Sequence, residues 1–385
     1  MVKYSKAKGK KIKTRDICYA AHIDRCIYQL YSFILNELYN DRVKQDGISS
    51  VAVAYRTDLF ESNIEFSKRA FDFIRAHSPC YIMIGDFTGF FDNLDHNYLK
   101  EQWCHLLEVS RLPADHFAVF KNITKYSKWE LTDLLRLNGL EDTFSGRHSL
   151  NALQQVLTHE QFVKNRTHIA KNQNSFGIPQ GSPISALLAN VYMLEVDKKI
   201  NDLVTALGGM YMRYSDDFIL ILPNLEQSQA VIELSQVINL LNDTPGLTLE
   251  PDKTQYFFYD APLLTNCGTV FHANADCRKR FVNFLGFTFD GEKVSVRSKT
   301  TAKYYYRMYR KVKTISACGG YTPNGKRISG KNLYERYSSR GIHSSQGNYL
   351  TYVERAKSVF GENEAIDRDT KRHMQKIRAA LKKQN

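Results

Sequence analysis

Two adjacent carboxylates interrupt a strongly apolar segment at residues 212–222, which reads MRYSDDFILIL. The residues on both sides of Asp216 and Asp217 are the β-branched, aromatic and aliphatic types that favour buried strands. Because burial of an unpaired charge is costly, these two carboxylates require a compensating partner. The segment therefore predicts two strands joined by a turn at 215–217, with the acidic pair presented at that turn.

A third carboxylate ends another predicted strand. Residues 78–87, SPCYIMIGDF, are typical of a strand that is entered through Pro79 and ends at Asp86. Strand ends in one sheet can bring Asp86 close to the acidic pair, where the three like charges would repel one another unless divalent cations lay between them. Two ions about 3.5–4 Å apart are the arrangement used for nucleotidyl transfer. Simple turn chemistry is the alternative for any single aspartate in such a position.

The rest of the chain predicts an α+β region followed by a mainly helical one. Helical spacing occupies 17–45, 63–77, 226–242 and most of 95–175, with breaks near Pro113, Gly139 and Gly146. Short strands are expected at 50–56 and in a pair within 279–289. In SFGIPQGSPISALLANVYMLEVDKKI (175–200) the Gly and Pro residues exclude a helix at first, and Ser182 and Pro183 then favour a helix start.

The positive charge is concentrated at the two ends of the chain. Residues 290–385 contain 22 Lys and Arg against 8 Asp and Glu, a net of +14 where the whole chain has +13. Residues 1–16 carry seven basic residues and one acidic residue, which leaves 17–289 at −7. A solvated charged face is the simplest interpretation of a basic stretch, but this segregation favours a surface that binds a polyanion.

Tyrosines alternate with basic residues in KYYYRMYRKVK, residues 303–313. Tyr304, Tyr305, Tyr306 and Tyr309 could lie mostly in the core of a helix. The basic residues between them would then face phosphates, and they are Lys303, Arg307, Arg310, Lys311 and Lys313.

The seven cysteines are an odd number at scattered positions, which favours reduced thiols over a disulfide framework. Cys267, His272 and Cys277 lie close together but lack the CxxC spacing of common zinc sites. The sequence has no run of 18 apolar residues, and its lysine-rich start is not followed by an apolar signal segment. We therefore expect a soluble, cytoplasmic protein that does not engage a membrane.

Five segments together resemble the palm motifs of reverse transcriptases. In chain order they are IMIGDFTGFFDNLDH, SFGIPQGSPISALLANVYM, MRYSDDFILIL, LTLEPDKTQ and NFLGFTF. The YxDD and GIPQGSPxS boxes are the most specific of them. The resemblance implies an α+β right-hand polymerase with an RRM-like antiparallel palm sheet and a helical thumb. The expected divisions are an N-terminal extension with fingers at 1–80, a palm at 81–290 with an insertion at about 95–175, and a basic thumb at 291–385.

The same resemblance assigns the catalytic and metal-binding residues. Asp86, Asp216 and Asp217 correspond to the catalytic aspartates, of which Asp86 and Asp216 would be direct ligands of two Mg²⁺ ions, with Mn²⁺ as the alternative metal. Lys253 in the PDKT segment resembles the lysine that assists pyrophosphate departure as a general acid. An exposed lysine after a turn is the alternative interpretation.

Contacts with the nucleotide are implied for Arg56, Phe87, Phe91, Gln180 and Gly181. Phe91, five residues after Asp86, stands where reverse transcriptases place an aromatic gate against the ribose 2′-hydroxyl, which favours dNTPs. A core aromatic beside Phe90 is the alternative. Gln180 would lie against the nucleotide and template, Gly181 would permit close backbone approach, and Arg56 resembles a finger arginine that holds the triphosphate.

The C-terminal part of the resemblance concerns the primer. Phe284, Leu285 and Gly286 resemble the primer-grip ribbon, which positions a 3′ end through backbone contacts. The thumb would then track the template–primer duplex with its basic residues.

Compact bacterial reverse transcriptases are the part of the family that the chain resembles most. The Asn–Ala–x–x–His and Val–Thr–Gly elements usual in retron enzymes are not found, and DFTGFF together with the residues after PQG resembles the defence-associated and abortive-infection group. This resemblance implies an anti-phage role in which a structured noncoding RNA is copied into cDNA from dNTPs. The alternatives are a retron-type enzyme that makes RNA-linked DNA, an untemplated DNA polymerase or an RNA polymerase, and an RNA-binding, toxin-like scaffold.

Overall fold

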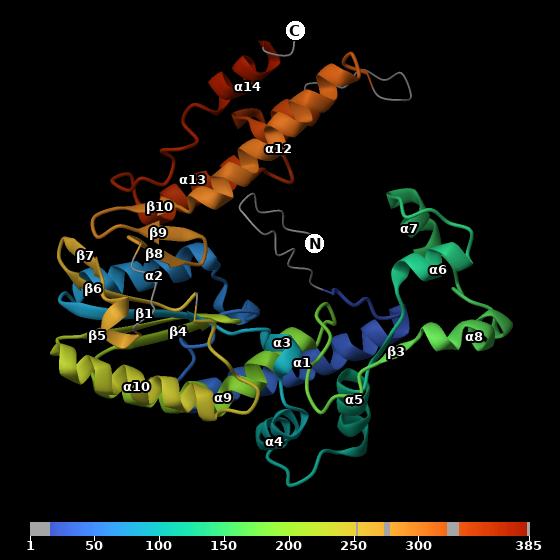
Figure 1. The fold of residues 1–385 in the computed structure, drawn as a ribbon, viewed down its shortest axis with the longest axis horizontal. Helices are drawn as coiled ribbons and strands as arrows, with labels where there is room; N and C mark the ends of the chain where they lie inside the picture. The colour runs from blue at the N-terminus through green and yellow to red at the C-terminus, as the bar shows by residue number, and fades with distance from the viewer. Residues whose placement is uncertain (1–15, 252, 273–277, 322–330, 383–385) are drawn as a thin grey trace. The chain divides into compact units, whose positions relative to one another are not determined.

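The computed structural model describes residues 16–251, 253–272, 278–321 and 331–382, and Figure 1 shows its ribbon. The chain forms two compact units, each assembled from segments far apart in the sequence. The first unit combines residues 1–49, 88–198 and 241–248, and the second combines residues 50–87, 199–240 and 249–385. These units cut across the three expected divisions, whose boundaries remain a prediction. The basic residues 1–15 lie outside the described part.

A five-stranded antiparallel sheet forms the centre of the second unit (Figure 1). In spatial order its strands are β4 (Met210–Tyr214), β5 (Asp217–Pro223), β1 (Cys80–Asp86), β6 (Gln255–Asp260) and β7 (Leu263–Asn266). The middle strand, β1, is buried from Cys80 to Gly85, because both of its faces carry apolar side chains, and only its last residue, Asp86, reaches solvent. Strand β1 therefore presents the carboxylate of Asp86 at its solvent-facing end.

Helix α2 (Asn63–Ala76) joins this sheet to a second, three-stranded sheet in one hydrophobic core. The second sheet has the order β10 (Val294–Val296), β9 (Phe287–Phe289) and β8 (Val282–Phe284). The helix begins at a capping box, in which the side chains of Ser62 and Glu65 satisfy free backbone N–H groups. Its apolar face places Phe66 and Phe71 in the same core as Phe284. The capping box thus fixes the residue at which α2 starts.

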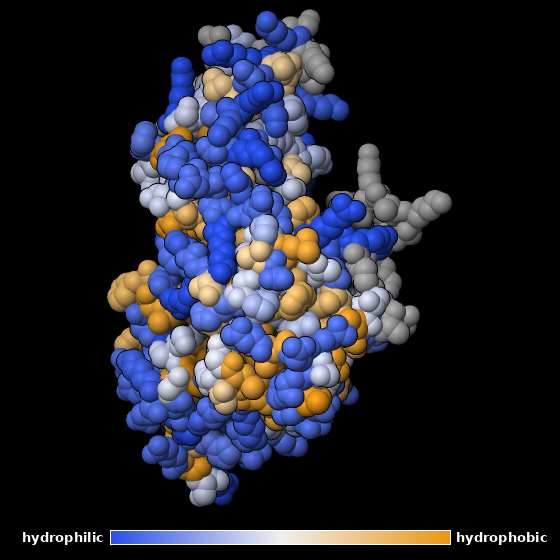
Figure 2. Space-filling view, turned by 90° about the vertical axis from the view of Figure 1, so that its left-hand side faces the viewer, coloured by the Kyte–Doolittle hydropathy of each residue, from blue (hydrophilic) through white to orange (hydrophobic). Residues whose placement is uncertain are grey.

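The C-terminal segment of the second unit is mainly helical. It contains α12 (Ser298–Ala317), a π-helical turn (Lys331–Glu335), a 3₁₀ turn (Ser339–Gly341), α13 (Tyr349–Phe360) and α14 (His373–Lys382). Tyr304, Tyr305 and Met308 of α12 are buried in a small core shared with Ile377 of α14. Figure 2, with this segment at the top, shows a mainly hydrophilic surface over it.

The remaining elements are helices of varied length and a small two-stranded ribbon. Those of the first unit are α1 (His22–Gln45), α3 (Phe90–Asn93), α4 (His96–Leu106), α5 (Ala114–Thr124), α6 (Leu131–Leu137), α7 (Phe144–Asn151), α8 (His159–Asn165), a 3₁₀ turn (Arg166–His168) and the ribbon of β2 (Ser127–Lys128) and β3 (Ala170–Lys171). The second unit adds a 3₁₀ turn (Thr57–Leu59) and α11 (Gly268–Phe271). Helices α9 (Ser185–Ala206) and α10 (Gln227–Asp243) have residues in both units.

Most of the expected elements are confirmed, two expectations are wrong, and one strand was missed. Residues 50–56 form no strand, because this segment makes only a single bridge, from Ala52 to Arg213. Gly146 does not break a helix but lies inside α7. Strand β10 was not expected. None of the described helices combines the length and the apolar character needed to cross a membrane.

Candidate active site

Asp86 and Asp217 lie directly opposite each other on neighbouring strands. The antiparallel register of β1 and β5 pairs Asp86 with Asp217 and continues to Cys80 and Pro223. Side chains opposed in this way share one face of the sheet, with Cβ atoms about 4.5–5.5 Å apart. The backbone carbonyl of Asp216 also accepts a hydrogen bond from the N–H of Phe87, at 3.3 Å. The prediction that strand ends bring these acidic residues together is confirmed.

The turn between β4 and β5 is held by two side chains from its surroundings. Ser215 has φ 60°, in the left-handed region that non-glycine residues seldom adopt. The hydroxyl of Tyr55 donates to Ser215 Oγ at 3.1 Å, and the fully buried guanidinium of Arg213 donates to the Ser215 carbonyl at 3.0 Å. Through these bonds Ser215 has a structural role in the turn, which the sequence did not reveal. They also show that Arg213 supports the turn from inside the sheet.

The carboxylates at this edge of the sheet repel one another. The pKa of Asp217 is raised from 3.8 to about 6, first by desolvation and then by the negative charges of Asp216 and Asp86. Lys253 and Arg297 act in the opposite direction. Because Asp217 is itself exposed to solvent, we attribute the shift chiefly to the two neighbouring carboxylates. A cation placed among them would relieve this repulsion.

One cation of the chain already contacts Asp86. The ammonium of Lys253 lies 2.5 Å from Asp86 Oδ2, whereas Asp86 Oδ1 is buried and has no hydrogen-bond partner among the described residues. An orphaned carboxylate oxygen beside a second carboxylate fits the oxygen ligands that Mg²⁺ prefers. Within the described ranges, however, no three His, Cys, Asp or Glu side chains are already clustered as a metal site. The acidic residues therefore provide oxygen ligands that suit Mg²⁺, but they do not form a complete set of metal ligands.

Gly85 and Phe87 flank Asp86 and serve the core. A Cβ atom at Gly85 would lie 2.2 Å from the ring of Phe218, so only glycine leaves room for that ring across the strand pair. Phe87 is 2% exposed, and its ring packs against Phe218 with centroids 5.7 Å apart. Its side chain thus belongs to the core, and its expected contact with a nucleotide stays a prediction.

Arg56 lies in an ion pair within its own segment. Its side chain is fully buried and forms a two-point ion pair with Asp58, with distances of 2.7 and 3.2 Å. Contact with a triphosphate stays a prediction, and it would require the guanidinium to leave this ion pair. The ion pair is local, because the adjacent 3₁₀ turn at 57–59 brings the Asp58 carboxylate back onto Arg56.

A cavity of about 280 Å³ lies beside Asp217 in the second unit. The turn at Phe284–Gly286 forms part of its wall, and the polar side chains of Asn63, Asn283 and Arg297 form another part. The predicted primer-grip residues are thus brought to the same cavity as one of the acidic residues. Neither Asn63 nor Arg297 was singled out by the sequence, because no local pattern links them to this turn.

Phe91, Gln180 and Gly181 belong to the first unit. Phe91 is half-buried in α3, and its carbonyl accepts the N–H of Ile178 at 2.9 Å. Gln180 Nε2 lies 3.4 Å from an oxygen of Asp92. A Cβ atom at Gly181 would lie 2.6 Å from the carbonyl oxygen of Cys18, whose N–H donates to the Gln180 carbonyl at 2.8 Å. The close backbone approach at Gly181 is therefore made by the chain itself.

The basic residues of α12 lie mainly on its outer surface. Lys303, Arg307, Arg310 and Lys313 are exposed, and Lys311 is half-buried. The tyrosines divide into two pairs, with Tyr304 and Tyr305 buried and Tyr306 and Tyr309 62% and 46% exposed. The expectation that most of these tyrosines belong to the core is thus half right. Two exposed tyrosines remain among the cations.

The zinc alternative has no support in the described residues. Cys267 is half-buried beside α11, and Cys277 lies outside the described residues. Among the residues that the structure does describe, which include Cys267 and His272, no three metal-ligating side chains lie together.

Residues 6–289 match the family model described as reverse transcriptase (RNA-dependent DNA polymerase). The chain belongs to the reverse transcriptase family. The antiparallel sheet with helices agrees with this membership, and the expected right-hand polymerase fold class is confirmed.

Individual proteins similar to this reverse transcriptase match it only in part. The Retron Mx162 reverse transcriptase of Myxococcus xanthus is 30% identical over 129 residues, which cover 32% of this chain and 26% of that relative. Apo telomerase from Candida tropicalis has 16% sequence identity and a TM-score of 0.42, covering 93% of this chain and 51% of that one. Telomerase from Candida albicans with a TWJ fragment of telomeric RNA has 14% identity and a TM-score of 0.40, covering 93% and 53%.

Proposed function

We propose that this reverse transcriptase synthesises DNA on an RNA template by two-metal nucleotidyl transfer. The observation that carries the proposal is the register that sets Asp86 opposite Asp217, with Asp216 in the adjoining turn. Family membership supports the reaction class. The raised pKa of Asp217 and the orphaned oxygen of Asp86 support a demand for cations at this edge.

Asp86, Asp216 and Asp217 would hold the divalent cations, Mg²⁺ in the first instance and Mn²⁺ as the alternative. When bound, such ions would activate the primer 3′-hydroxyl and neutralise charge on the triphosphate. The ion pair between Lys253 and Asp86 Oδ2 orients the Lys253 nitrogen. As the primer 3′-hydroxyl loses its proton to water and its oxygen bonds to the α-phosphorus, the bond to pyrophosphate would break, and Lys253 would donate a proton to the departing pyrophosphate.

The choice of sugar is assigned to Phe91. The half-buried ring of Phe91 has the bulk to collide with a ribose 2′-hydroxyl, and the backbone of Phe91 is fixed by the bond from the N–H of Ile178 to its carbonyl. As the resemblance implies, Gln180 would lie against the nucleotide and template, and Gly181 would permit close backbone approach. The substrates would accordingly be dNTPs.

The template–primer duplex would bind along α12. Its exposed lysines and arginines can contact phosphates, and the exposed Tyr306 and Tyr309 can pack on sugars or bases. Arg310 already lies 5.9 Å from the Tyr306 ring centroid, so cation and ring present one mixed surface. The net charge of +14 in residues 290–385 supports the same role.

A defined template tests the reaction. We expect purified protein to extend a DNA primer on an RNA template after EDTA treatment only when Mg²⁺ or Mn²⁺ is restored. A DNA template of the same sequence and a reaction without template serve as controls. Equal synthesis without template would contradict RNA-directed synthesis and support the untemplated alternative.

We further propose that the enzyme works in the bacterial cytoplasm, copying a structured noncoding RNA into cDNA as part of anti-phage defence. The partial identity with a retron reverse transcriptase favours one second candidate, an enzyme that makes RNA-linked DNA. Sequencing the RNA and DNA that co-purify with the protein from its native host distinguishes the two. One dominant structured RNA with free complementary DNA supports the first, whereas DNA covalently joined to RNA supports the second. A mixed population of cellular RNA without complementary DNA would contradict both.

A further inference from the structure

The two-residue turn between β8 and β9 has an unusual backbone. Phe284 pairs with Phe287, so Leu285 and Gly286 alone make the turn. Both residues have positive φ, 44° for Leu285 and 96° for Gly286, as in type I′ hairpin turns. Glycine adopts this region freely, but leucine does not. The turn therefore needs support from outside its own hairpin.

Two neighbouring elements supply that support through the turn's carbonyl groups. The side-chain amide of Asn63 donates to the Leu285 carbonyl at 2.8 Å, and the backbone N–H of Arg297 donates to the Gly286 carbonyl at 2.9 Å. Asn63 is the first residue of α2, and Arg297 immediately precedes α12. The strained Leu285 position is thus fixed by a single side chain.

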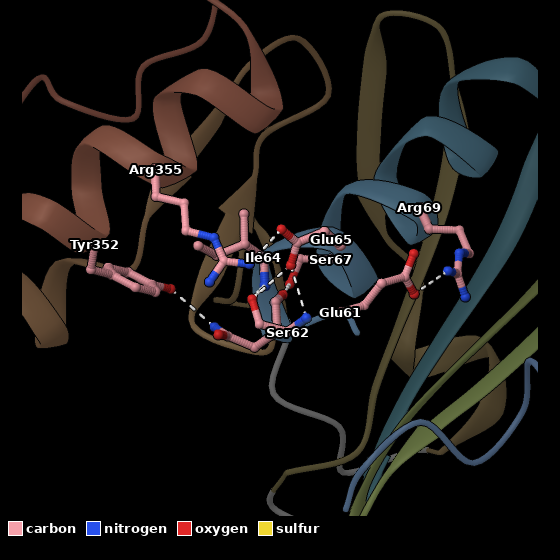
Figure 3. Close-up of polar contacts among 9 residues, drawn as sticks. Glu61, Ser62, Ile64, Glu65, Ser67, Arg69, Tyr352 and Arg355 are labelled. Carbon is pink, nitrogen blue, oxygen red and sulfur yellow. Dashed lines mark hydrogen bonds and ion pairs between the residues drawn. The ribbon is translucent and has the colours of Figure 1, made fainter. Parts of the chain in front are cut away.

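The same amide group of Asn63 also contacts helix α13. It donates to the hydroxyl of Tyr352 at 3.0 Å, while Arg355, one turn further along α13, forms an ion pair with Glu65 at 2.8 Å. Figure 3 shows Tyr352 and Arg355 both directed from α13 toward the start of α2, where Ser62 and Glu65 complete the capping box. Asn63 therefore connects the turn to α13 through one carboxamide.

Asn63, Leu285 and Asp217 line one cavity, which has a volume of about 280 Å³. Arg297 contributes to the same wall, and its positive charge acts to lower the pKa of Asp217. A displacement of the turn would change the shape of this cavity directly beside the acidic residue.

We propose that Asn63 is a positioning residue for the primer 3′ end, acting through the turn at Phe284–Gly286. This inference rests on the proposed polymerase function. By holding the Leu285 carbonyl, Asn63 sets the distance between the turn and Asp217, and by its bond to Tyr352 it transmits the position of α13 to that turn.

The test compares Asn63→Ala and Asn63→Asp with Ser62→Ala in the full chain. The first two remove the amide donor, whereas Ser62→Ala weakens the same helix start but leaves the Leu285 bond in place. Single-turnover extension of a DNA primer on an RNA template is measured over a range of dNTP and duplex concentrations. Thermal unfolding of each variant is recorded alongside.

We expect both Asn63 variants to add the first nucleotide about tenfold more slowly, because a small misplacement of a reacting end is costly. The KM for dNTP should stay within about twofold, since the nucleotide itself is not contacted. Tyr352→Phe removes only the hydroxyl that accepts the second bond from Asn63, so it should slow addition of the first nucleotide by less than the Asn63 variants do. Ser62→Ala should retain the wild-type rate despite a lowered Tm.

The inference is overturned if the Asn63 variants extend primers at the wild-type rate, or if Ser62→Ala loses as much activity as they do. Failure of the polymerase proposal looks different, since extension would then survive replacement of Asp216 and Asp217. The two failures are therefore separable in one set of assays.

Discussion

Asp86 is the cross-strand partner of Asp217, so two carboxylates occupy opposing positions at the end of a buried strand pair. The fit of the Phe218 ring over Gly85, its cross-strand partner, fixes this register, because a slip by one residue would place the ring opposite a side chain. The position of the acidic pair is therefore a consequence of core packing. Repulsion between these carboxylates therefore destabilises the folded chain when no cation is bound.

The raised pKa of Asp217 predicts a pH-dependent stability difference. Its pKa of about 6 in the folded chain exceeds the ordinary value of 3.8, so its contribution to stability is complete below pH 3.8 and is lost as pH rises through about 6. In the presence of EDTA, Asp217→Asn should raise Tm at pH 7.5 and change it little near pH 4. Thermal unfolding across this range is the measurement. A difference in Tm that does not vary with pH would contradict the proposed repulsion.

The left-handed conformation of Ser215 predicts different stabilities for two small substitutions. Both Ser215→Ala and Ser215→Gly lose the bond from Tyr55, but only glycine relieves the positive φ. The glycine variant should be more stable than the alanine variant by about 1 kcal/mol in urea unfolding. Tyr55→Phe, which removes the donor alone, should cost about 0.5–1.5 kcal/mol. Equal stability of the glycine and alanine variants would show that the turn is not strained.

The assignment of Phe91 as a sugar gate predicts a change in selectivity rather than in overall rate. Phe91→Ala should lower the ratio of kcat/KM for dNTP over rNTP by about 10–200-fold, the range that a steric pocket contact provides. Phe90→Ala is the matched control, because Phe90 is buried beside Phe91. Single-nucleotide incorporation with paired dNTP and rNTP measures this ratio. Equal use of both sugars by the wild type would refute the gate.

The exposed cations of α12 predict a salt-dependent weakening of duplex affinity. Replacing Lys303, Arg307, Arg310 and Lys313 by Gln should reduce the slope of log K against log salt by about 0.7–0.9 for each phosphate that is no longer neutralised. Charge-conserving exchanges of Lys303 and Lys313 to Arg provide the control and should leave the slope unchanged. Fluorescence anisotropy of a labelled duplex at several salt concentrations gives both values. A slope unaffected by the four replacements would place the duplex elsewhere.

Sequence patterns indicated the elements that carry the acidic residues but not the contacts that fix them. Strands β1, β4 and β5 were predictable because continuous apolar runs with turn residues at their ends favour buried strands. The burial of Arg56 and Phe87 was not predictable, since it depends on Asp58 folding back and on the ring of Phe218 in a neighbouring strand. The bond from Asn63 to Leu285 joins residues 222 positions apart, and no local periodicity records such a pair.

The central claim is that Asp216 and Asp217, with Asp86, make DNA synthesis dependent on divalent cations. The most direct test measures incorporation of labelled dNTP on an RNA template by wild type, by the double variant Asp216→Asn with Asp217→Asn, and by Asp243→Asn. Asp243 is an exposed aspartate at the end of α10 and serves as the control for loss of a carboxylate. We predict that Mg²⁺-dependent incorporation is abolished in the double variant and unchanged in the control. Incorporation at the wild-type rate by a folded double variant would contradict the account.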